Sequence, residues 1–189
     1  MPFVKNNYHY ELKLPVEFIP RSVDMGERYH VLYPVMGLDS RLDKNFSDWF
    51  KTIGVMIGHG EQFLLRPDGR NFHIIHTDDF GVDPIVKLNY VFCDTPNFMN
   101  WYKLKSGVEL TTSYSPAGTP YGSCSLEECD LVYSAQCGKP SLVNVTELHD
   151  VSKVSSPRTC YSFVLAHNTA PYKRLTWSEA EEIFKDYII

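Results

Sequence analysis

The segment Phe72-His73-Ile74-Ile75-His76-Thr77-Asp78 joins a β-strand pattern to polar residues at its end. Its aromatic and β-branched residues favour a strand over 72–78. Side chains two positions apart on an extended strand leave the same face, so His76 and Asp78 can bind one ion together. The segment therefore predicts a strand that ends in two metal ligands.

His149 is a candidate third ligand, although it lies 73 positions after His76. A sheet that closes on itself would let the two strands face each other inside one mouth. Two imidazoles and one carboxylate on one side of a metal leave the opposite side open, as in non-haem Fe(II) oxygenases. We therefore predict that His76, Asp78 and His149 are the metal ligands and the catalytic residues. The adjacent Asp79 points to the other face and is expected to be a solvated turn residue.

Short β-rich runs separated by turn residues occupy most of the chain. We expect short strands and loops over 1–40, and strands over 61–66, 85–92, 97–105, 127–133, 141–146, 147–151 and 158–166. The segment 107–122 carries several glycines and prolines and is expected to be a loop-rich lid or rim. Many short strands with helices only at the flanks indicate a mainly β sandwich or barrel, and a jelly roll protects sheet edges at this size.

Two flanking helices are predicted. The first covers roughly 44–53 and has apolar residues at helical spacing, namely Phe46, Trp49, Phe50 and Ile53. Gly54 offers a stop for this helix. The second covers 177–187 and begins after Thr176, with Glu179 three positions on completing a capping box.

Length and charge narrow the choice of class. The chain has 189 residues, of which 43% are hydrophobic and 14% aromatic. This is enough for one buried core, so we expect a single domain over 1–189. The formal net charge of −5 lacks the basic surplus typical of proteins that bind nucleic acid. Nucleic acid is therefore a disfavoured partner.

The cysteines and the N-terminus indicate a compartment. The five cysteines form no CxxC pair and are odd in number, which suits free thiols in a reducing environment. No charged N-terminal region precedes an apolar run, and no stretch approaches the roughly 20 apolar residues of a membrane-spanning helix. We expect a soluble cytoplasmic protein without a membrane partner.

Arg158 follows His149 by nine positions and opens the apolar run 159–165. A guanidinium at the start of an interior strand needs an anion, and a dicarboxylic acid bound to the metal would offer its far carboxylate. Ser162 shares the face of Arg158 by strand alternation, so its hydroxyl is a further candidate donor to that carboxylate. The alternative for Arg158 is an ion pair on the surface.

With His-x-Asp, a distal histidine and a downstream arginine in this order, the sequence resembles the Fe(II)- and 2-oxoglutarate-dependent oxygenases. The likeness to small stand-alone microbial and phage members extends over about 44–166. It includes the motifs Phe46-Ser47-Asp48-Trp49-Phe50, Leu88-Asn89-Tyr90, Asn100-Trp101-Tyr102-Lys103 and Leu142-Val143-Asn144.

The resemblance implies a double-stranded β-helix (a cupin-like jelly roll) in which His76, Asp78 and His149 bind Fe(II). It also implies that Arg158 holds the C5 carboxylate of 2-oxoglutarate, and that reaction with O2 releases succinate and CO2. In related halogenases a small residue replaces the carboxylate ligand. Because Asp78 is retained, the resemblance implies hydroxylation of a substrate C–H bond.

Two other functions fit parts of the sequence. A cupin-like module that binds a ligand without turnover would leave His76 and His149 as ordinary interior histidines. The tripeptide His167-Asn168-Thr169 matches one half of a two-histidine phosphoesterase, but the second His-x-Thr is missing. The remaining histidines have no partner at ligand spacing and are expected to be structural or solvated: His9, His30, His59 and His73.

The sequence leaves the substrate and the oligomeric state open. Residues that select a substrate usually lie on loops around the mouth of a site, where one sequence offers no pattern to read. A small molecule and a peptide side chain both remain candidate substrates.

Overall fold

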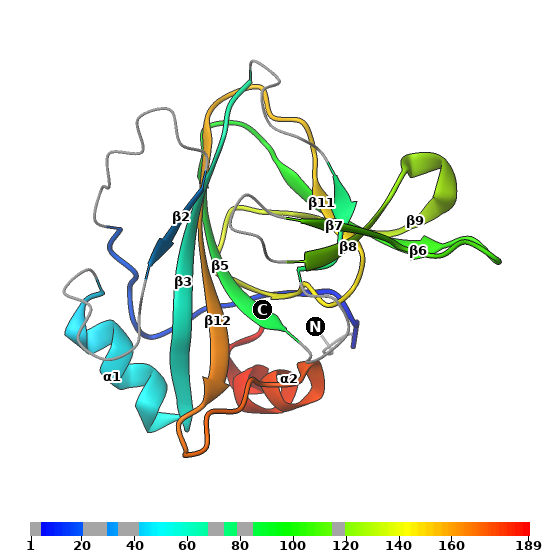
Figure 1. Cartoon of the computed structure of the whole chain (residues 1–189). Coiled ribbons are helices and arrows are strands. Elements are labelled where there is room, and N and C mark those ends of the chain that lie inside the picture. Colours follow the sequence, from blue (N-terminus) through cyan, green and yellow to red (C-terminus); the bar gives the residue numbers. More distant parts are fainter. Residues whose placement is uncertain (1–4, 21–29, 34–41, 68–73, 79–84, 115–119) are drawn as a thin grey trace.

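The computed structural model describes residues 5–20, 30–33, 42–67, 74–78, 85–114 and 120–189, with only the backbone described at 30–33. These residues form two antiparallel six-stranded sheets and two α-helices (Figure 1). The chain is therefore mainly β, as the sequence predicts. No helix in the described part of the chain is long and apolar enough to cross a membrane.

Each sheet combines strands from distant parts of the chain. The first sheet has the order β1 (His9–Glu11), β10 (Ser141–Asn144), β5 (Val86–Cys93), β12 (Arg158–His167), β3 (Val55–Leu65) and β2 (His30–Tyr33). The second has the order β7 (Thr111–Tyr114), β8 (Pro120–Cys124), β4 (Ile75–His76), β11 (His149–Val151), β6 (Phe98–Leu104) and β9 (Cys129–Gln136).

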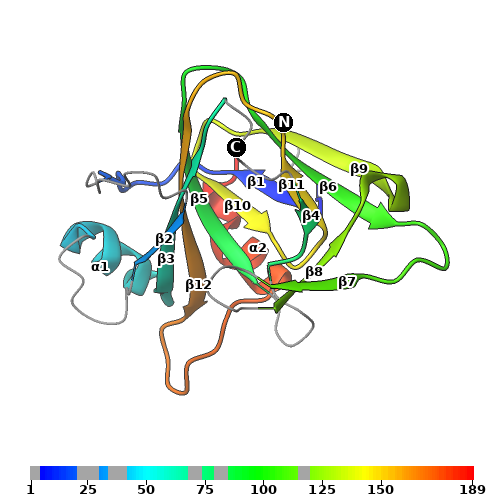
Figure 2. The same ribbon diagram turned by 45° about the horizontal axis from the view of Figure 1, so that its top comes forward.

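Eight of these strands pair in a nested order. Going inward from the two ends of the series, β3 pairs with β12, β4 with β11, β5 with β10, and β6 with β9. Successive pairs fall in alternate sheets, so the chain forms a two-stranded ribbon wound through both sheets. This winding brings β4 and β11 side by side although they lie far apart in the sequence (Figure 2).

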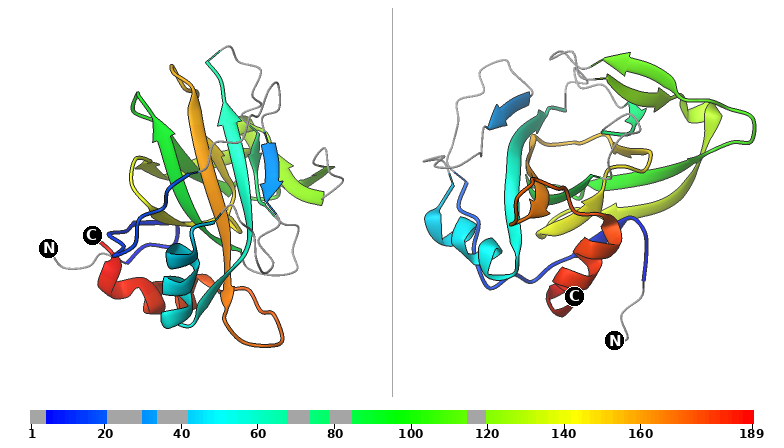
Figure 3. Two further views of the ribbon diagram at one scale, coloured as in Figure 1. Left: turned by 90° about the vertical axis from the view of Figure 1, so that its left-hand side faces the viewer. Right: turned by 60° about the horizontal axis from the view of Figure 1, so that its bottom comes forward.

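The two helices cover the first sheet on the side that faces away from the second sheet (Figure 3). They are α1 (Lys44–Thr52) and α2 (Trp177–Phe184), and the short 3-10 helix η2 (Lys185–Tyr187) follows α2. Buried apolar side chains, most of them aromatic, fill the space between helices and sheet, and we call this group the helix-side cluster: Phe18, Phe46, Phe50, Ile57, Leu88, Tyr90, Tyr161, Phe163 and Phe184.

The other face of the first sheet meets the second sheet. Apolar side chains fill part of this space, and we call them the inter-sheet cluster: Ile85, Val91, Met99, Trp101, Val143, Val145, Cys160 and Val164. Trp101 is fully buried and donates from Nε1 to the carbonyl oxygen of Asn144 over 2.9 Å. The metal-ligand candidates and Arg158 lie at this same interior layer.

Local signals in the sequence predict the helices well. Helix α1 begins after Asp43, whose side chain accepts hydrogen bonds from the backbone of Asn45 and Phe46. Helix α2 has the expected capping box between Thr176 and Glu179. Helix α1 lies where the spacing of apolar residues places it, and α2 together with η2 covers the predicted range 177–187.

The prediction that 107–122 is loop-rich is wrong for 111–114 and 120–122. Strands β7 and β8 pair there as a hairpin at the edge of the second sheet, and 115–119 lie outside the described residues. Proline is tolerated as the first residue of a strand, and Pro120 occupies that position in β8. The predicted strand over 72–78 is also shorter, since β4 covers Ile75–His76, and Asp79 lies outside the described residues.

Candidate metal centre

His76 and His149 lie directly opposite each other on the neighbouring strands β4 and β11. The two strands therefore lie side by side as direct neighbours in one sheet. The ring centroids of the two histidines are 4.6 Å apart. Adjacent strands stand about 4.7–4.9 Å apart, so this pairing alone brings the two imidazoles together.

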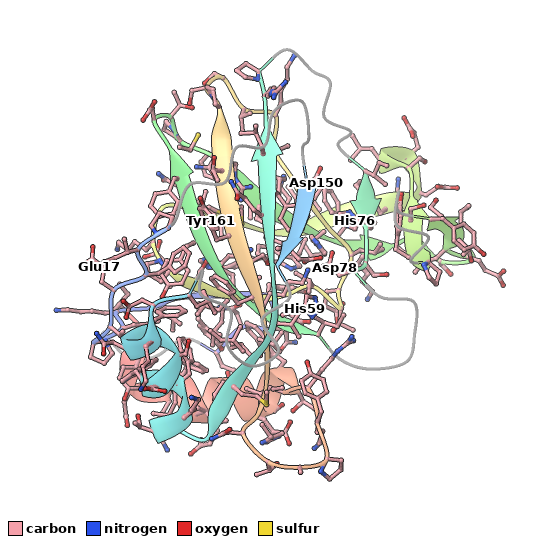
Figure 4. All side chains as sticks on the ribbon, turned by 60° about the vertical axis from the view of Figure 1, so that its left-hand side comes forward. Glu17, His59, His76, Asp78, Asp150 and Tyr161 are labelled. Carbon is pink, nitrogen blue, oxygen red and sulfur yellow. The ribbon has the colours of Figure 1, made fainter. Side chains whose placement is uncertain are left out.

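Asp78 lies just beyond the end of β4, where the chain is held by backbone hydrogen bonds. The N–H of Thr77 donates to the carbonyl oxygen of Gly122 over 2.9 Å, and that of Asp78 to Val145 over 3.0 Å. These contacts direct the Asp78 carboxylate at both imidazoles. Its Oδ1 lies 3.3 Å from Nε2 of His76 and 3.4 Å from Nε2 of His149. Figure 4 shows His76 and Asp78 close together beside the first sheet.

The three side chains present suitable ligand atoms within 4.8 Å of one another. Nδ1 of His76 lies 2.8 Å from the carbonyl oxygen of Ile74, and Nδ1 of His149 lies 2.9 Å from that of Glu147. A carbonyl oxygen only accepts, so Nδ1 carries the proton of each neutral ring. The lone pair of each Nε2 is then free to bind a metal, which is how backbone carbonyls commonly orient histidine ligands.

The electrostatics of the centre favour a cation. Two imidazole lone pairs and a carboxylate oxygen converge, and this arrangement is repulsive until a proton or a metal ion lies between them. Burial opposes ionisation of Asp78, but Lys87 and the two histidines hold its pKa well below the usual range. Burial likewise tends to lower the pKa of His76, but the Asp78 carboxylate raises it above the ordinary value. The centre thus keeps a negative charge and attracts a positive one.

Lys87 is an ion-pair partner of the centre that the sequence reading missed. Its Nζ lies 2.6 Å from Oδ2 of Asp78, and it also forms an ion pair with Glu61 of β3. The Lys87 side chain is 7% exposed, yet these two carboxylates raise its pKa against the effect of burial. The one sequence signal for Lys87 was strand alternation, which assigns Lys87 and Asn89 to one face of the strand. In the structure, Leu88 and Tyr90 on the other face belong to the helix-side cluster.

His59 also lies near the centre, although the group of candidate ligands found among the described residues does not include it. The register of β3 against β12 shifts between Val164 and Leu165, which pair with His59 and Ile57. Gly58, between these two, is therefore an extra residue in β3. This β-bulge puts Ile57 in the helix-side layer and His59 on the interior face with Glu61. Burial lowers the pKa of His59, and the charges of Glu61, Lys87 and Asp78 also act on it. Figure 4 shows His59 on β3 below Asp78.

Arg158 is buried, so the alternative of a surface ion pair is wrong. It is 2% exposed, and its Nε donates to Oδ1 of Asn97 over 2.9 Å. Within the described ranges, no carboxylate forms an ion pair with Arg158. A buried guanidinium usually has an anionic partner, because its charge is otherwise poorly compensated. The neutral Asn97 leaves Arg158 as an interior cation to which an anionic ligand could bind.

The metal centre and Arg158 lie at different points along the interior face of the first sheet. Lys87 lies opposite Val164, and Arg158 is six positions along β12, about 20 Å at 3.3 Å per residue. Their long side chains reduce this separation: the Lys87 ammonium lies 5.7 Å from the ring centroid of Phe63, which is opposite Cys160. Burial raises the pKa of Cys160 to about 11, while both cations act to lower it. Cys160 lies on β12 between Arg158 and Val164, on the same face of the strand.

Ser162 lies on the interior face, but four positions from Arg158. Its hydroxyl donates to Oδ1 of Asn89 over 2.6 Å and is buried. The spacing along β12 corresponds to about 13 Å at 3.3 Å per residue. Ser162 thus lies between the metal centre and Arg158, and in this structure its hydrogen bond is to Asn89.

The other predicted features lie away from the centre. His9 is buried against the ring of Trp101, and burial lowers its pKa to about 4. His167 pairs with Glu179 of α2 at 3.2 Å. All five cysteines are free thiols, as the sequence predicts. The side chains of His30 and His73 lie outside the described residues.

A scan against protein-family models finds none that matches the chain. A search of curated proteins also finds no significant match.

Proposed function

We propose that this chain is an Fe(II)- and 2-oxoglutarate-dependent dioxygenase that hydroxylates a C–H bond and releases succinate and CO2. The observation that carries the proposal is the convergence of Nε2 of His76, Oδ1 of Asp78 and Nε2 of His149. Two neutral imidazoles and one carboxylate are the ligand set of non-haem Fe(II) oxygenases. When bound, such an iron activates O2 for oxidation of the cosubstrate and the substrate.

The strand order supports a double-stranded β-helix. Counted along the chain from β3 to β12 without the β7–β8 hairpin, the eight nested strands lie in the orders 1-8-3-6 and 2-7-4-5. A jelly roll has this arrangement, in which a paired ribbon wraps around itself so that its two sheets face each other. The candidate ligands lie on strands 2 and 7 and just beyond strand 2, and Arg158 begins strand 8.

Arg158 is the proposed anchor for the far carboxylate of 2-oxoglutarate. A guanidinium can bind a carboxylate through two parallel hydrogen bonds, and the Nε of Arg158 donates to the neutral amide oxygen of Asn97. Ser162 lies on the same strand face between Arg158 and the metal centre. Its proposed contact is therefore with the middle of the bound 2-oxoglutarate. This refines the expectation that Ser162 binds the same carboxylate as Arg158.

The charges of the interior support the binding of a metal and a cosubstrate whose charges cancel. Two carboxylates, Asp78 and Glu61, and two cations, Lys87 and Arg158, are buried or nearly so, and their formal charges cancel. A divalent metal and the dianion of 2-oxoglutarate also cancel, so both together leave the interior neutral. Either ligand alone would add two uncompensated charges to a medium of low dielectric constant.

The side chains of the centre also suggest where substrate approaches. The His149 side chain is 6% exposed, whereas that of His76 is 33% exposed. The ring of Tyr121 on β8 contacts His76 edge-on at 5.6 Å between centroids. We infer that substrate reaches the metal from the β7–β8 side, with Tyr121 at the rim.

The proposal is tested by succinate formation. Protein purified without oxygen, loaded with Fe(II) and 2-oxoglutarate and then exposed to air, should form succinate slowly even without a substrate. An Asp78→Ala variant should form none beyond a protein-free control. A cupin-like binding module would bind metal without forming succinate, and that result would overturn the proposal.

A further inference from the structure

Glu61, Lys87 and Asp78 form a continuous chain of ion pairs across the interior. Glu61 lies on β3 and Lys87 on β5, both in the first sheet, while Asp78 follows β4 of the second sheet. The candidate metal ligands all come from the second sheet or the residues just after its strand β4. Lys87 is therefore the point at which the first sheet contacts the metal centre through a charge.

The two oxygens of Asp78 have different partners. Oδ1 faces both histidine nitrogens, at 3.3 Å and 3.4 Å. Oδ2 faces the Lys87 ammonium at 2.6 Å. A lone lysine contact would allow the carboxylate to rotate, but Glu61 holds the other side of the ammonium. The carboxylate is thus fixed with one oxygen toward the metal centre and the other turned away.

Stability alone does not require this chain of charges. Replacing a buried ion pair by neutral groups of similar size is often neutral or stabilising, because burial removes the charges from water. Partners of metal ligands, in contrast, are commonly needed to orient those ligands. The arrangement of Glu61 and Lys87 around one oxygen of Asp78 fits the second role.

We propose that Lys87 is a positioning residue that reserves Oδ1 of Asp78 for the metal by holding Oδ2, and that Glu61 holds Lys87 in place. This inference rests on the proposed metal centre. Without Lys87, both oxygens of Asp78 could bind the metal and take a position that 2-oxoglutarate or O2 needs. The buried lysine therefore keeps the open side of the metal available.

The test uses Glu61→Gln/Lys87→Met, because this double variant removes one negative and one positive charge. The net charge near the metal is unchanged, so a change in metal affinity reports orientation. We expect Mn(II) binding, measured from the electron paramagnetic resonance signal of free Mn(II), to weaken about 10- to 100-fold. Val164→Ala is the matched control: it lies opposite Lys87 in the inter-sheet cluster and contacts no ligand through a charge. Its Mn(II) affinity should stay within about threefold of the wild-type value, since it leaves the partners of the ligands intact.

A second measurement uses the wild-type protein and so does not depend on how the variant folds. The quantity measured is the number of exchangeable waters on the bound Mn(II). If Mn(II) is six-coordinate and binds one oxygen of Asp78 and two histidines, about three positions are left for water. Two waters in the wild type, or unchanged Mn(II) affinity in the double variant, would overturn the role of Lys87. Failure of the wild type to bind Mn(II) at all would instead overturn the proposed metal centre.

Discussion

The two faces of the first sheet differ sharply although the same strands build both. On β5, Leu88 and Tyr90 point into the helix-side cluster, whereas Lys87 and Asn89 point between the sheets. The helix-side face is aromatic and apolar throughout its cluster. The interior face buries a lysine, an arginine and their polar partners beside the apolar inter-sheet cluster.

This difference indicates that the two faces of the sheet have different roles. Aromatic burial stabilises the fold through the hydrophobic effect and close packing. Buried charges rarely add net stability, because their desolvation offsets the attraction between them. We infer that the helix-side face supplies most of the stability of the sheet, while the interior face supplies the site. Substitutions on the two faces should therefore affect different properties.

The largest effect is expected for Asp78→Ala. It removes the carboxylate ligand and should abolish hydroxylation. Mn(II) affinity should fall by more than about 100-fold, because losing a residue that only orients a ligand already costs up to about 100-fold. The thermal midpoint should fall little, because Lys87 keeps its ion pair with Glu61 when Asp78 is lost and a buried carboxylate adds little net stability. The vacated position should also be tested for chloride binding. Full activity in this variant would exclude Asp78 as a ligand and make Asp79 the next candidate.

Phe163→Ala probes the opposite face of the same strand as Ser162. Phe163 is 2% exposed and contacts several rings of the helix-side cluster. Its loss should reduce the free energy of unfolding by about 3–5 kcal/mol, measured by urea denaturation. The Mn(II) affinity of the remaining folded protein should be unchanged. A large loss of metal affinity would show that the two faces are not independent.

Arg158→Gln separates cosubstrate binding from metal binding. Losing a buried two-pronged contact should weaken 2-oxoglutarate binding by about 2–5 kcal/mol, measured by calorimetry on Mn(II)-loaded protein. Metal affinity should be unchanged, because Arg158 contacts none of the candidate ligands. Equal affinity of the variant and the wild type for 2-oxoglutarate would exclude Arg158 as the anchor.

The smallest effect is expected for Thr176→Ala at the start of α2. Its hydroxyl accepts a hydrogen bond from the backbone N–H of Glu179, and loss of such a cap costs about 1 kcal/mol. Urea denaturation should detect this loss, while binding of metal and cosubstrate stays at the wild-type level. Altered cosubstrate binding would indicate that the helix side contributes to the site.

Local patterns in the sequence predicted the parts of the fold that depend on local interactions. Helix α1 and the capping box of α2 are such cases, since caps and apolar spacing act within one element. The hairpin β7–β8 was missed because its strands are short, contain proline and glycine, and lie at a sheet edge. The pairing of His76 with His149 depends on the path of the chain through both sheets, which one sequence does not specify.

The candidate site shows the same limit. His76, Asp78, His149 and Arg158 could be selected from the sequence because their residue types and order carry a chemical pattern. Lys87 and Glu61 could not, because a lysine and a glutamate on two strands look like ordinary exposed residues until the sheets are assembled. His59 required the bulge at Gly58, which reverses the alternation of β3 and leaves no clear mark in the sequence.

The central claim is that one interior holds the metal and the cosubstrate together, and a crystal structure with Mn(II) and 2-oxoglutarate tests it most directly. Mn(II) replaces Fe(II) because it is stable in air. We expect the metal between Nε2 of His76, Oδ1 of Asp78 and Nε2 of His149, with the far carboxylate of 2-oxoglutarate on the guanidinium of Arg158. Metal bound elsewhere, or a 2-oxoglutarate that does not contact Arg158, would contradict it.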